Sequence, residues 1–204
     1  NMPNTARLVD GKYVFTPFKD EVSNSGSAPV DWESLSDKAF KSGVVPMQAS
    51  GGCPYKCAYC TFRKDDRIIY IKPVEKIIDE LKAVSRRGVR YVRFIDDNFR
   101  LGAPNLEGFC QRVIEEDIQI RWMTMIKIST LEKVDADLLR RSGCIDVALG
   151  LESTEPVVLR NMNKKANPAI YGPVVKRLLE AGINCSCYFL LGFPGETDES
   201  ALRT

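Results

Sequence analysis

The sequence contains no histidine, which excludes any metal site that mixes cysteine with histidine. It also has no apolar run long enough to span a bilayer, and no secretory apolar segment follows Met2. The net charge of +2 is too small to indicate nucleic acid as an obligatory partner. We therefore expect a protein of the cytoplasm that has no membrane span and does not depend on nucleic acid.

The residues that are present are typical of one large globular domain. The chain has 204 residues, of which 44% are hydrophobic and 27% are charged. A chain of this length can bury a sizeable core. Seven cysteines are present, but an odd count without a secretory segment argues against a disulfide framework.

Three of these cysteines lie in one short loop, and their arrangement is the most informative feature of the chain. Cys53, Cys57 and Cys60 have the spacing C-x3-C-x2-C, with no fourth cysteine nearby. Three thiolates on so short a loop can hold three corners of a cuboidal iron–sulfur cluster and leave the fourth iron open to a small molecule. We therefore favour an iron–sulfur cluster and a reducing environment.

Two other interpretations of the cysteines stay open. An all-cysteine zinc site requires a distant fourth ligand, and the three loop thiols could also bind nothing. The other four cysteines are expected to be small buried apolar residues. Two of them lie two residues apart on a predicted strand and share a face, so a redox role for that pair is an alternative. The four are Cys110, Cys144, Cys185 and Cys187.

Strand and helix patterns alternate from Val44 onward, whereas residues 1–44 are predicted to be mostly irregular. Within that first part we expect a short strand at 12–18 and a polar linker at 23–29. Five strands are predicted at 45–49, 91–95, 121–126, 146–150 and 186–191, and helical patterns follow each of the first four. Serial β-then-α units predict an α/β fold with parallel strands, either an open doubly wound sheet or part of a β/α barrel.

Polar residues and glycines follow the predicted strands, at the edge where ligands of such folds bind. Asp96 and Asp97 follow the second strand, Lys127 the third, Glu152 the fourth and Gly192 the fifth. Each could instead be an ordinary turn or helix-capping residue, as could Thr197. Apart from Thr197, all of them, like the cysteine loop, come directly after a predicted strand, which favours one shared site.

Five segments make a family resemblance specific. They are Ser50–Arg63, Phe94–Phe99, Leu149–Thr154, Asn161–Lys164 and Leu191–Thr197. Together they resemble the core of the radical S-adenosylmethionine (radical SAM) superfamily. The subgroup that carries an upstream cobalamin-binding domain is the most similar, as in anaerobic magnesium-protoporphyrin ester cyclases and cobalamin-dependent radical methylases.

The resemblance divides the chain into an N-terminal connector, residues 1–44, and a radical SAM core, residues 45–204. It implies a partial (β/α) barrel that is truncated after about five β/α units, where the family has six. We therefore expect that these 204 residues alone are inactive. We also expect them to self-associate through the open edge of the fifth strand.

The resemblance also implies roles for particular residues. The cluster would be a [4Fe-4S] cluster held by Cys53, Cys57 and Cys60. Glu152 would bind the ribose of S-adenosylmethionine (SAM), and Lys127 would face its carboxylate, where the subgroup more often has arginine. The remaining predicted contacts are Ile95, Asp96 and Asp97 at the methionyl ammonium, with Tyr59, Leu191 and Gly192 beside the adenine.

The implied reaction is reductive cleavage of SAM to a 5′-deoxyadenosyl radical, which takes hydrogen from a small-molecule substrate. The electron would come from a protein of the flavodoxin or ferredoxin type, and the full-length protein would bind cobalamin. Two alternatives stay open. One is an RNA-modifying methylthiotransferase with an appended RNA-binding domain, which the near-neutral charge disfavours. The other is an iron–sulfur module without catalysis.

Overall fold

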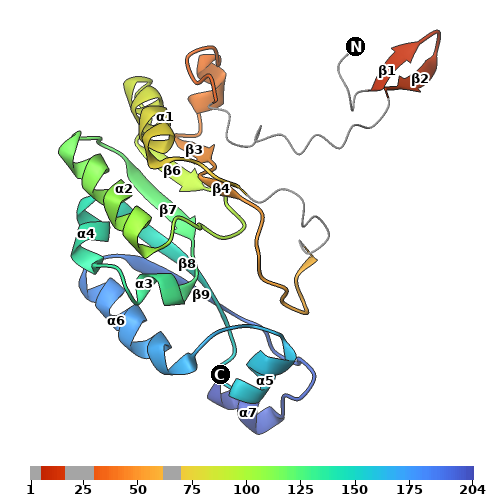
Figure 1. Ribbon diagram of the computed structural model, residues 1–204, viewed down its shortest axis with the longest axis vertical. Helices are drawn as coiled ribbons and strands as arrows, with labels where there is room; N and C mark the ends of the chain where they lie inside the picture. Colours follow the sequence, from red (N-terminus) through yellow and green to blue (C-terminus); the bar gives the residue numbers. More distant parts are fainter. Residues whose placement is uncertain (1–5, 17–29, 62–69) are drawn as a thin grey trace.

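The computed structural model describes residues 6–16, 30–61 and 70–204 (Figure 1). The polar linker that we predict at 23–29 lies outside these residues. Near the N-terminus, β1 (Ala6–Val9) and β2 (Lys12–Phe15) form an antiparallel hairpin. The strand predicted at 12–18 is present as the shorter β2, whereas β1 and the hairpin were not predicted. Asp10 and Gly11 both have positive φ, as a tight two-residue hairpin turn requires.

A five-stranded parallel sheet organises the rest of the chain, in the order β3-β6-β7-β8-β9. Every neighbouring pair in this sheet is parallel. The five predicted strands are confirmed, with ends that shift by a few residues. Their bounds are β3 Val44–Met47, β6 Tyr91–Phe94, β7 Arg121–Met125, β8 Cys144–Glu152 and β9 Asn184–Phe189. The α/β class and parallel strands predicted from the sequence are thus confirmed.

The longer helices lie along one side of this sheet (Figure 1). The predicted helices are present as α1 Val74–Arg86, α2 Ala103–Glu115, α4 Ala136–Arg141 and α6 Tyr171–Glu180. After the fifth strand, α7 (Asp198–Arg203) begins with Thr197 as its capping residue. No helix among the described residues is long and apolar enough to cross a membrane.

Several short elements were not predicted. Two of them, α3 and α5, follow β7 and β8 directly and therefore lie near the carboxyl ends of the strands. The bounds of the unpredicted elements are α3 Ile128–Leu131, α5 Pro156–Asn161, η2 Asp37–Phe40, η4 Pro168–Ile170, β4 Ser50–Gly51 and β5 Tyr70–Ile71. The pair β4 and β5 is antiparallel and flanks the cysteine loop.

The core lies between the sheet and the helices α1, α2, α4 and α6. Phe94, Phe99, Phe109 and Trp122 form an aromatic cluster there, in which Phe99 and Trp122 stack with their ring centroids 6.1 Å apart. Cys110 and Cys144 are fully buried in the same core, as predicted. Cys185 and Cys187 share a face of β9, as predicted, but they are only partly buried against this core, so the expectation that all four are buried is wrong for this pair. All four are free thiols.

Candidate functional site

The start of the cysteine loop is held by the carboxylate of Asp96. Ser50 donates its hydroxyl to Asp96 Oδ1 at 2.6 Å, its backbone N–H bonds the same oxygen, and the N–H of Ala49 bonds Oδ2 at 3.2 Å. Burial raises the pKa of Asp96, and these hydrogen bonds offset part of that effect. The side chain of Asp96 therefore anchors the loop beside the end of β6.

The middle of the loop is fixed by the segment that follows α5. The N–H of Ala58 donates to the carbonyl of Met162 at 2.8 Å. The side chain of Asn163 donates to the carbonyl of Lys56, also at 2.8 Å. The loop is therefore held at its start by Asp96, which follows β6, and in its middle by the segment that follows α5.

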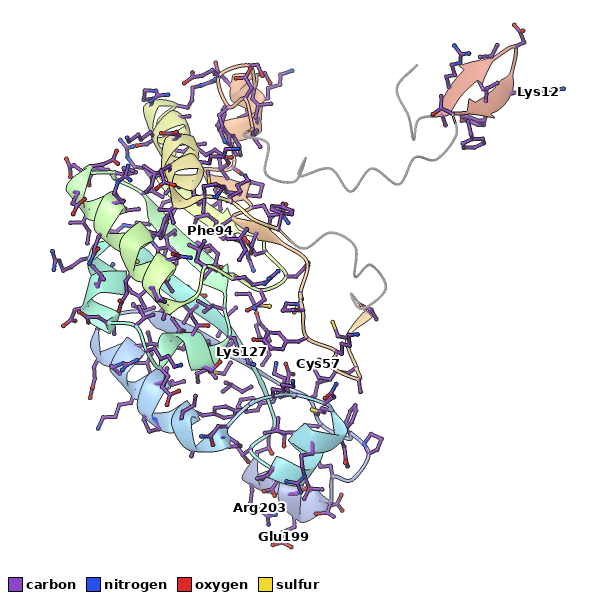
Figure 2. The ribbon with its side chains drawn as sticks, viewed as in Figure 1. Lys12, Cys57, Phe94, Lys127, Glu199 and Arg203 are labelled. Carbon is purple, nitrogen blue, oxygen red and sulfur yellow. The ribbon has the colours of Figure 1, made fainter. Side chains whose placement is uncertain are left out.

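All three loop cysteines line one cavity of about 260 Å³ at the carboxyl ends of the strands. Figure 2 labels Cys57 and Lys127, which lie on the loop and next to the sheet respectively. The predicted site residues Tyr59, Asp97, Lys127 and Glu152 line the same cavity. Sequence reasoning missed the other lining residues, which are Tyr55, Asn98, Met125, Ile126, Gly150, Lys164, Lys165 and Tyr188.

The loop thiols suit a cluster better than a single metal ion. Within residues 6–16, 30–61 and 70–204, no group of three or more cysteine or acidic residues is close enough to hold one ion. A cuboidal cluster does not need such convergence, because each thiolate binds a different iron. Cys53, Cys57 and Cys60 are all free and face one cavity, so the donor set present fits a three-cysteine cluster.

Glu152 is the centre of a small polar network in this cavity. Its Oε1 accepts a hydrogen bond from the hydroxyl of Tyr59 at 2.9 Å. The same oxygen forms an ion pair with the ammonium of Lys164 at 3.2 Å. Lys164 also donates to the hydroxyl of Tyr59 at 3.3 Å. Burial and the hydrogen bond to Glu152 raise the pKa of Tyr59 above its ordinary value. Tyr59 therefore stays a neutral hydrogen-bond donor.

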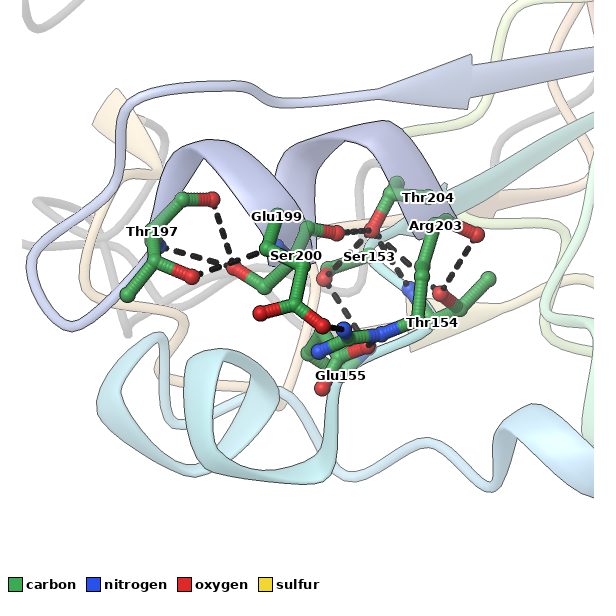
Figure 3. Close-up of polar contacts among 8 residues, drawn as sticks. All are labelled: Ser153, Thr154, Glu155, Thr197, Glu199, Ser200, Arg203 and Thr204. Carbon is green, nitrogen blue, oxygen red and sulfur yellow. Dashed lines mark hydrogen bonds and ion pairs between the residues drawn. The ribbon is translucent and has the colours of Figure 1, made fainter.

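The segment just beyond Glu152 is fastened to α7 (Figure 3). Thr154 donates its hydroxyl to the carbonyl of Arg203 at 3.2 Å. Arg203 forms an ion pair with Glu155 at 2.8 Å. Glu152 itself has a φ of +68°, an uncommon conformation for a residue other than glycine. These contacts hold the backbone in the turn that directs the Glu152 carboxylate into the cavity.

Lys127 reaches the cavity from just beyond β7, at the N-cap position of α3, where its side chain makes no capping hydrogen bond. Its ammonium lies 3.9 Å from the ring centroid of Tyr55, which belongs to the cysteine loop. This cation–π contact places a positive charge on the cavity wall between the sheet and the loop. Asp97 supplies a negative charge to the same wall.

The structure does not bring the remaining predicted residues to this cavity. Asp96 is turned toward Ser50, and Ile95 is 55% exposed in a different cavity. Leu191 is 67% exposed, and the N–H of Gly192 bonds Glu196. Contacts of these four residues with SAM stay predictions. From the same stretch of chain, Tyr188 and Phe193 are better placed, since Tyr188 lines the cavity and the Phe193 ring meets Tyr59 edge-on at 6.5 Å.

A comparison with family models decides the class of protein. The model of the radical SAM superfamily matches residues 47–204, which is most of the chain. The chain belongs to the radical SAM superfamily. Use of an iron–sulfur cluster and of SAM follows from this membership, and the sequence-based prediction of the family is confirmed.

Two curated relatives are methyltransferase and cyclase enzymes. The chain is 32% identical over 176 residues to bacteriochlorophyllide d C-12(1)-methyltransferase of Chlorobaculum tepidum, covering 80% of the chain and 37% of that protein. It is 25% identical over 204 residues to anaerobic magnesium-protoporphyrin IX monomethyl ester cyclase of Rubrivivax gelatinosus, covering 96% of the chain and 37% of that protein. The chain thus spans less than half the length of these radical SAM relatives.

A solved structure has the same fold. The methyltransferase TsrM of Kitasatospora setae, solved with cobalamin and a [4Fe-4S] cluster bound, matches 96% of the chain and 43% of its own length. The TM-score is 0.71 at 18% identity, so this likeness shows the fold. The predicted similarity to anaerobic magnesium-protoporphyrin ester cyclases is confirmed by the Rubrivivax gelatinosus relative.

Proposed function

We propose that this chain is the cofactor-binding core of an enzyme that methylates or cyclises a small molecule with the help of cobalamin. The observation that carries the proposal is one cavity that contains both the three loop thiols and the network of Glu152, Tyr59 and Lys164. A cluster and a nucleoside could be held side by side there. Similarity to a methyltransferase and to a cyclase supports these two reaction types.

Cys53, Cys57 and Cys60 are proposed to hold the cluster, which leaves one iron without a protein ligand. Together with SAM, the bound cluster supplies one-electron cleavage chemistry. The protein positions these cofactors and keeps water away from them. Asp96 and Asn163 serve this purpose indirectly, because they fix the loop on which the thiols lie.

The polar residues of the cavity are proposed to hold SAM. Glu152 is buried and negatively charged, so it suits two ribose hydroxyls as an acceptor. Lys127 provides a positive charge for the methionyl carboxylate, and Asp97 an acceptor for the ammonium. Tyr59 holds Glu152 in place and offers its ring to the adenine.

The remaining functional expectations also belong to this proposal. The electron donor is a protein of the flavodoxin or ferredoxin type, and the enzyme acts in the cytoplasm. Residues 1–44 connect the core to a cobalamin-binding domain. Because the relatives are more than twice as long, we propose that these 204 residues bind cofactors without turning over substrate.

Anaerobic reconstitution followed by titration with SAM tests the proposal. We expect about four irons per chain and a change in the electron paramagnetic resonance spectrum of the reduced cluster when SAM is added. Replacing Cys53, Cys57 or Cys60 by Ala should abolish the cluster, whereas Cys110→Ala should retain it because that thiol is buried in the core. A spectrum that does not respond to SAM would favour a non-catalytic iron–sulfur module instead.

A further inference from the structure

On the face of the sheet opposite the helices, a cationic, an apolar and an anionic side chain lie next to one another in a row, on three neighbouring strands. Strand register places Arg93 of β6 beside Met123 of β7, and Met123 beside Asp146 of β8. The two neighbours of Arg93 in the strand, Val92 and Phe94, are buried in the core. Because side chains alternate along a strand, Arg93 points to the opposite face. We call this side of the sheet the open face.

A cavity of about 610 Å³ hollows the open face. Arg93, Met123 and Asp146 line the part of it that lies farther from the carboxyl ends of the strands. Met125 and Tyr188 line both this cavity and the one that contains the loop cysteines. The two cavities are therefore neighbours that share a wall, and a molecule lying on the open face can reach the cofactor cavity.

The two charged groups of the row are not neutralised by the protein. Arg93 makes no ion pair or side-chain hydrogen bond within the described part of the chain. Asp146 accepts one long hydrogen bond, 3.4 Å, from the hydroxyl of Ser186. Arg93 and Asp146 are two strands apart, about 9.5 Å at the usual strand spacing, so Met123 separates them. An arginine without a carboxylate partner beside an apolar surface is suited to an anionic ligand.

Resting on the proposed function, we propose that the open face binds the substrate and selects an amphipathic molecule with an anionic oxygen group, a carboxylate or a phosphate. The anionic group pairs with Arg93, and the apolar body lies over Met123 and Met125 toward the cofactor cavity. Asp146 repels a second anion and accepts a hydrogen bond from a donor on the substrate.

The register also sets the size of this substrate. Asp146 and Gly150 lie on the same strand and the same face, and Gly150 lines the cofactor cavity. Four residues of strand correspond to roughly 13 Å. A substrate that pairs with Arg93 and presents a carbon to the cofactors must therefore span about this length, as a molecule with several rings or a long chain does.

Matched naphthalene probes test the proposal on the reconstituted full-length protein. The probes are 2-naphthylacetate, 2-naphthylmethyl phosphate and the uncharged 2-naphthaleneethanol, with dissociation constants from isothermal titration calorimetry. We expect Arg93→Gln to weaken binding of an anionic probe about ten-fold, because a charge-assisted bidentate pair is lost. Binding of the alcohol should not change. A selective loss with the acetate but not the phosphate, or the reverse, identifies which anion the site takes.

Two controls decide the outcome. Arg141→Gln removes the same charge from an exposed arginine at the opposite edge of the sheet and should leave binding of all three probes unchanged. Asp146→Asn should tighten binding of the anionic probes, since it removes a nearby negative charge. Equal weakening of charged and uncharged probes by Arg93→Gln, or no weakening, overturns the proposal.

The same samples separate this inference from the proposed function. If SAM still perturbs the cluster spectrum of Arg93→Gln while anion selectivity is missing from the unmodified protein, only the substrate inference fails. If SAM does not perturb the spectrum of the unmodified protein, the proposed function fails, whatever the probes do.

Discussion

The hydroxyl of Tyr59 donates a hydrogen bond of 2.9 Å to the carboxylate of Glu152, across 93 residues of sequence. This bond joins the loop that carries the cysteines to the end of β8. Because Lys164 contacts both partners, the two halves of the cavity are fixed by one shared network. A change at Glu152 should therefore affect nucleoside binding while the separate anchors of the loop persist.

Glu152→Gln should weaken SAM binding by roughly ten-fold or more, because hydrogen bonds to a charged acceptor contribute about 1.5–3 kcal/mol. Iron content should be unchanged, since the loop keeps its contacts with Asp96 and Met162. Equilibrium dialysis of SAM and an iron assay on the same preparation measure both quantities. Glu132→Gln, at an exposed carboxylate, provides the matched control. An unchanged affinity would mean that Glu152 only shapes the turn after β8.

Ser50→Ala should lower the free energy of unfolding by about 1–3 kcal/mol, because a buried acceptor loses a partner. Ser50 is fully buried and its hydroxyl bonds Asp96 at 2.6 Å. Urea unfolding monitored by circular dichroism measures the difference. Ser85→Ala on α1 is the control, because that serine is not buried and alanine favours helix. Equal stability of the two variants would show that Asp96 does not depend on Ser50.

Stability should decline at alkaline pH because the thiols of Cys110, in the core, and Cys185, packed against it, resist ionisation in the folded protein. Burial raises the pKa of Cys185 from 9.0 to about 11 and that of Cys110 to about 12. A raised folded-state pKa means that the stabilisation is complete below the unfolded value of 9.0 and is lost as the pH rises through the folded value. Urea midpoints measured from neutral pH to 11 should fall above 9, and less steeply in Cys185→Ala. Identical slopes would exclude Cys185 as a cause.

The outer edge of β9 should promote self-association of these 204 residues, because within the described part of the chain β9 pairs with β8 alone. Phe189, the last residue of β9, is 42% exposed, and Leu191, two residues beyond the strand, is 67% exposed. Multi-angle light scattering should detect a dimer, and Phe189→Lys should shift it toward monomer by placing a charge on the edge. The same material should form no 5′-deoxyadenosine. A monomer that forms 5′-deoxyadenosine at the rate of the full-length protein contradicts both expectations.

Local patterns in the sequence were sufficient to predict the five strands and the four longer helices, because each has apolar residues at a regular period. They were insufficient for α3 and α5, which show no apolar period, whereas α4, also only six residues long, was predicted because Val134, Leu138 and Leu139 lie at helical spacing just before Gly143. β1 and its pairing with β2 were missed, although Asp10-Gly11 is a recognised turn signal.

The site was predictable where a motif carries it and not where tertiary contacts decide it. Cysteine spacing located the loop, and the strand ends located Asp97, Lys127 and Glu152. Nothing local indicates that Lys164 reaches Glu152 from twelve residues away, or that Asp96 turns toward Ser50. Side-chain alternation along β9 turns Tyr188 toward the cavity, whereas Leu191 lies beyond the strand and is exposed.

The anchors of the cysteine loop also determine when during synthesis a cluster can be received. Asn163 and the carbonyl that it bonds, that of Lys56, are separated by 107 residues. Because the chain is made from its N-terminus, the three thiols leave the ribosome long before this anchor exists. A nascent chain that ends before α5 would hold its cysteines only from the Asp96 side. Delivery of iron and sulfide should therefore favour chains in which β8 and α5 have already formed.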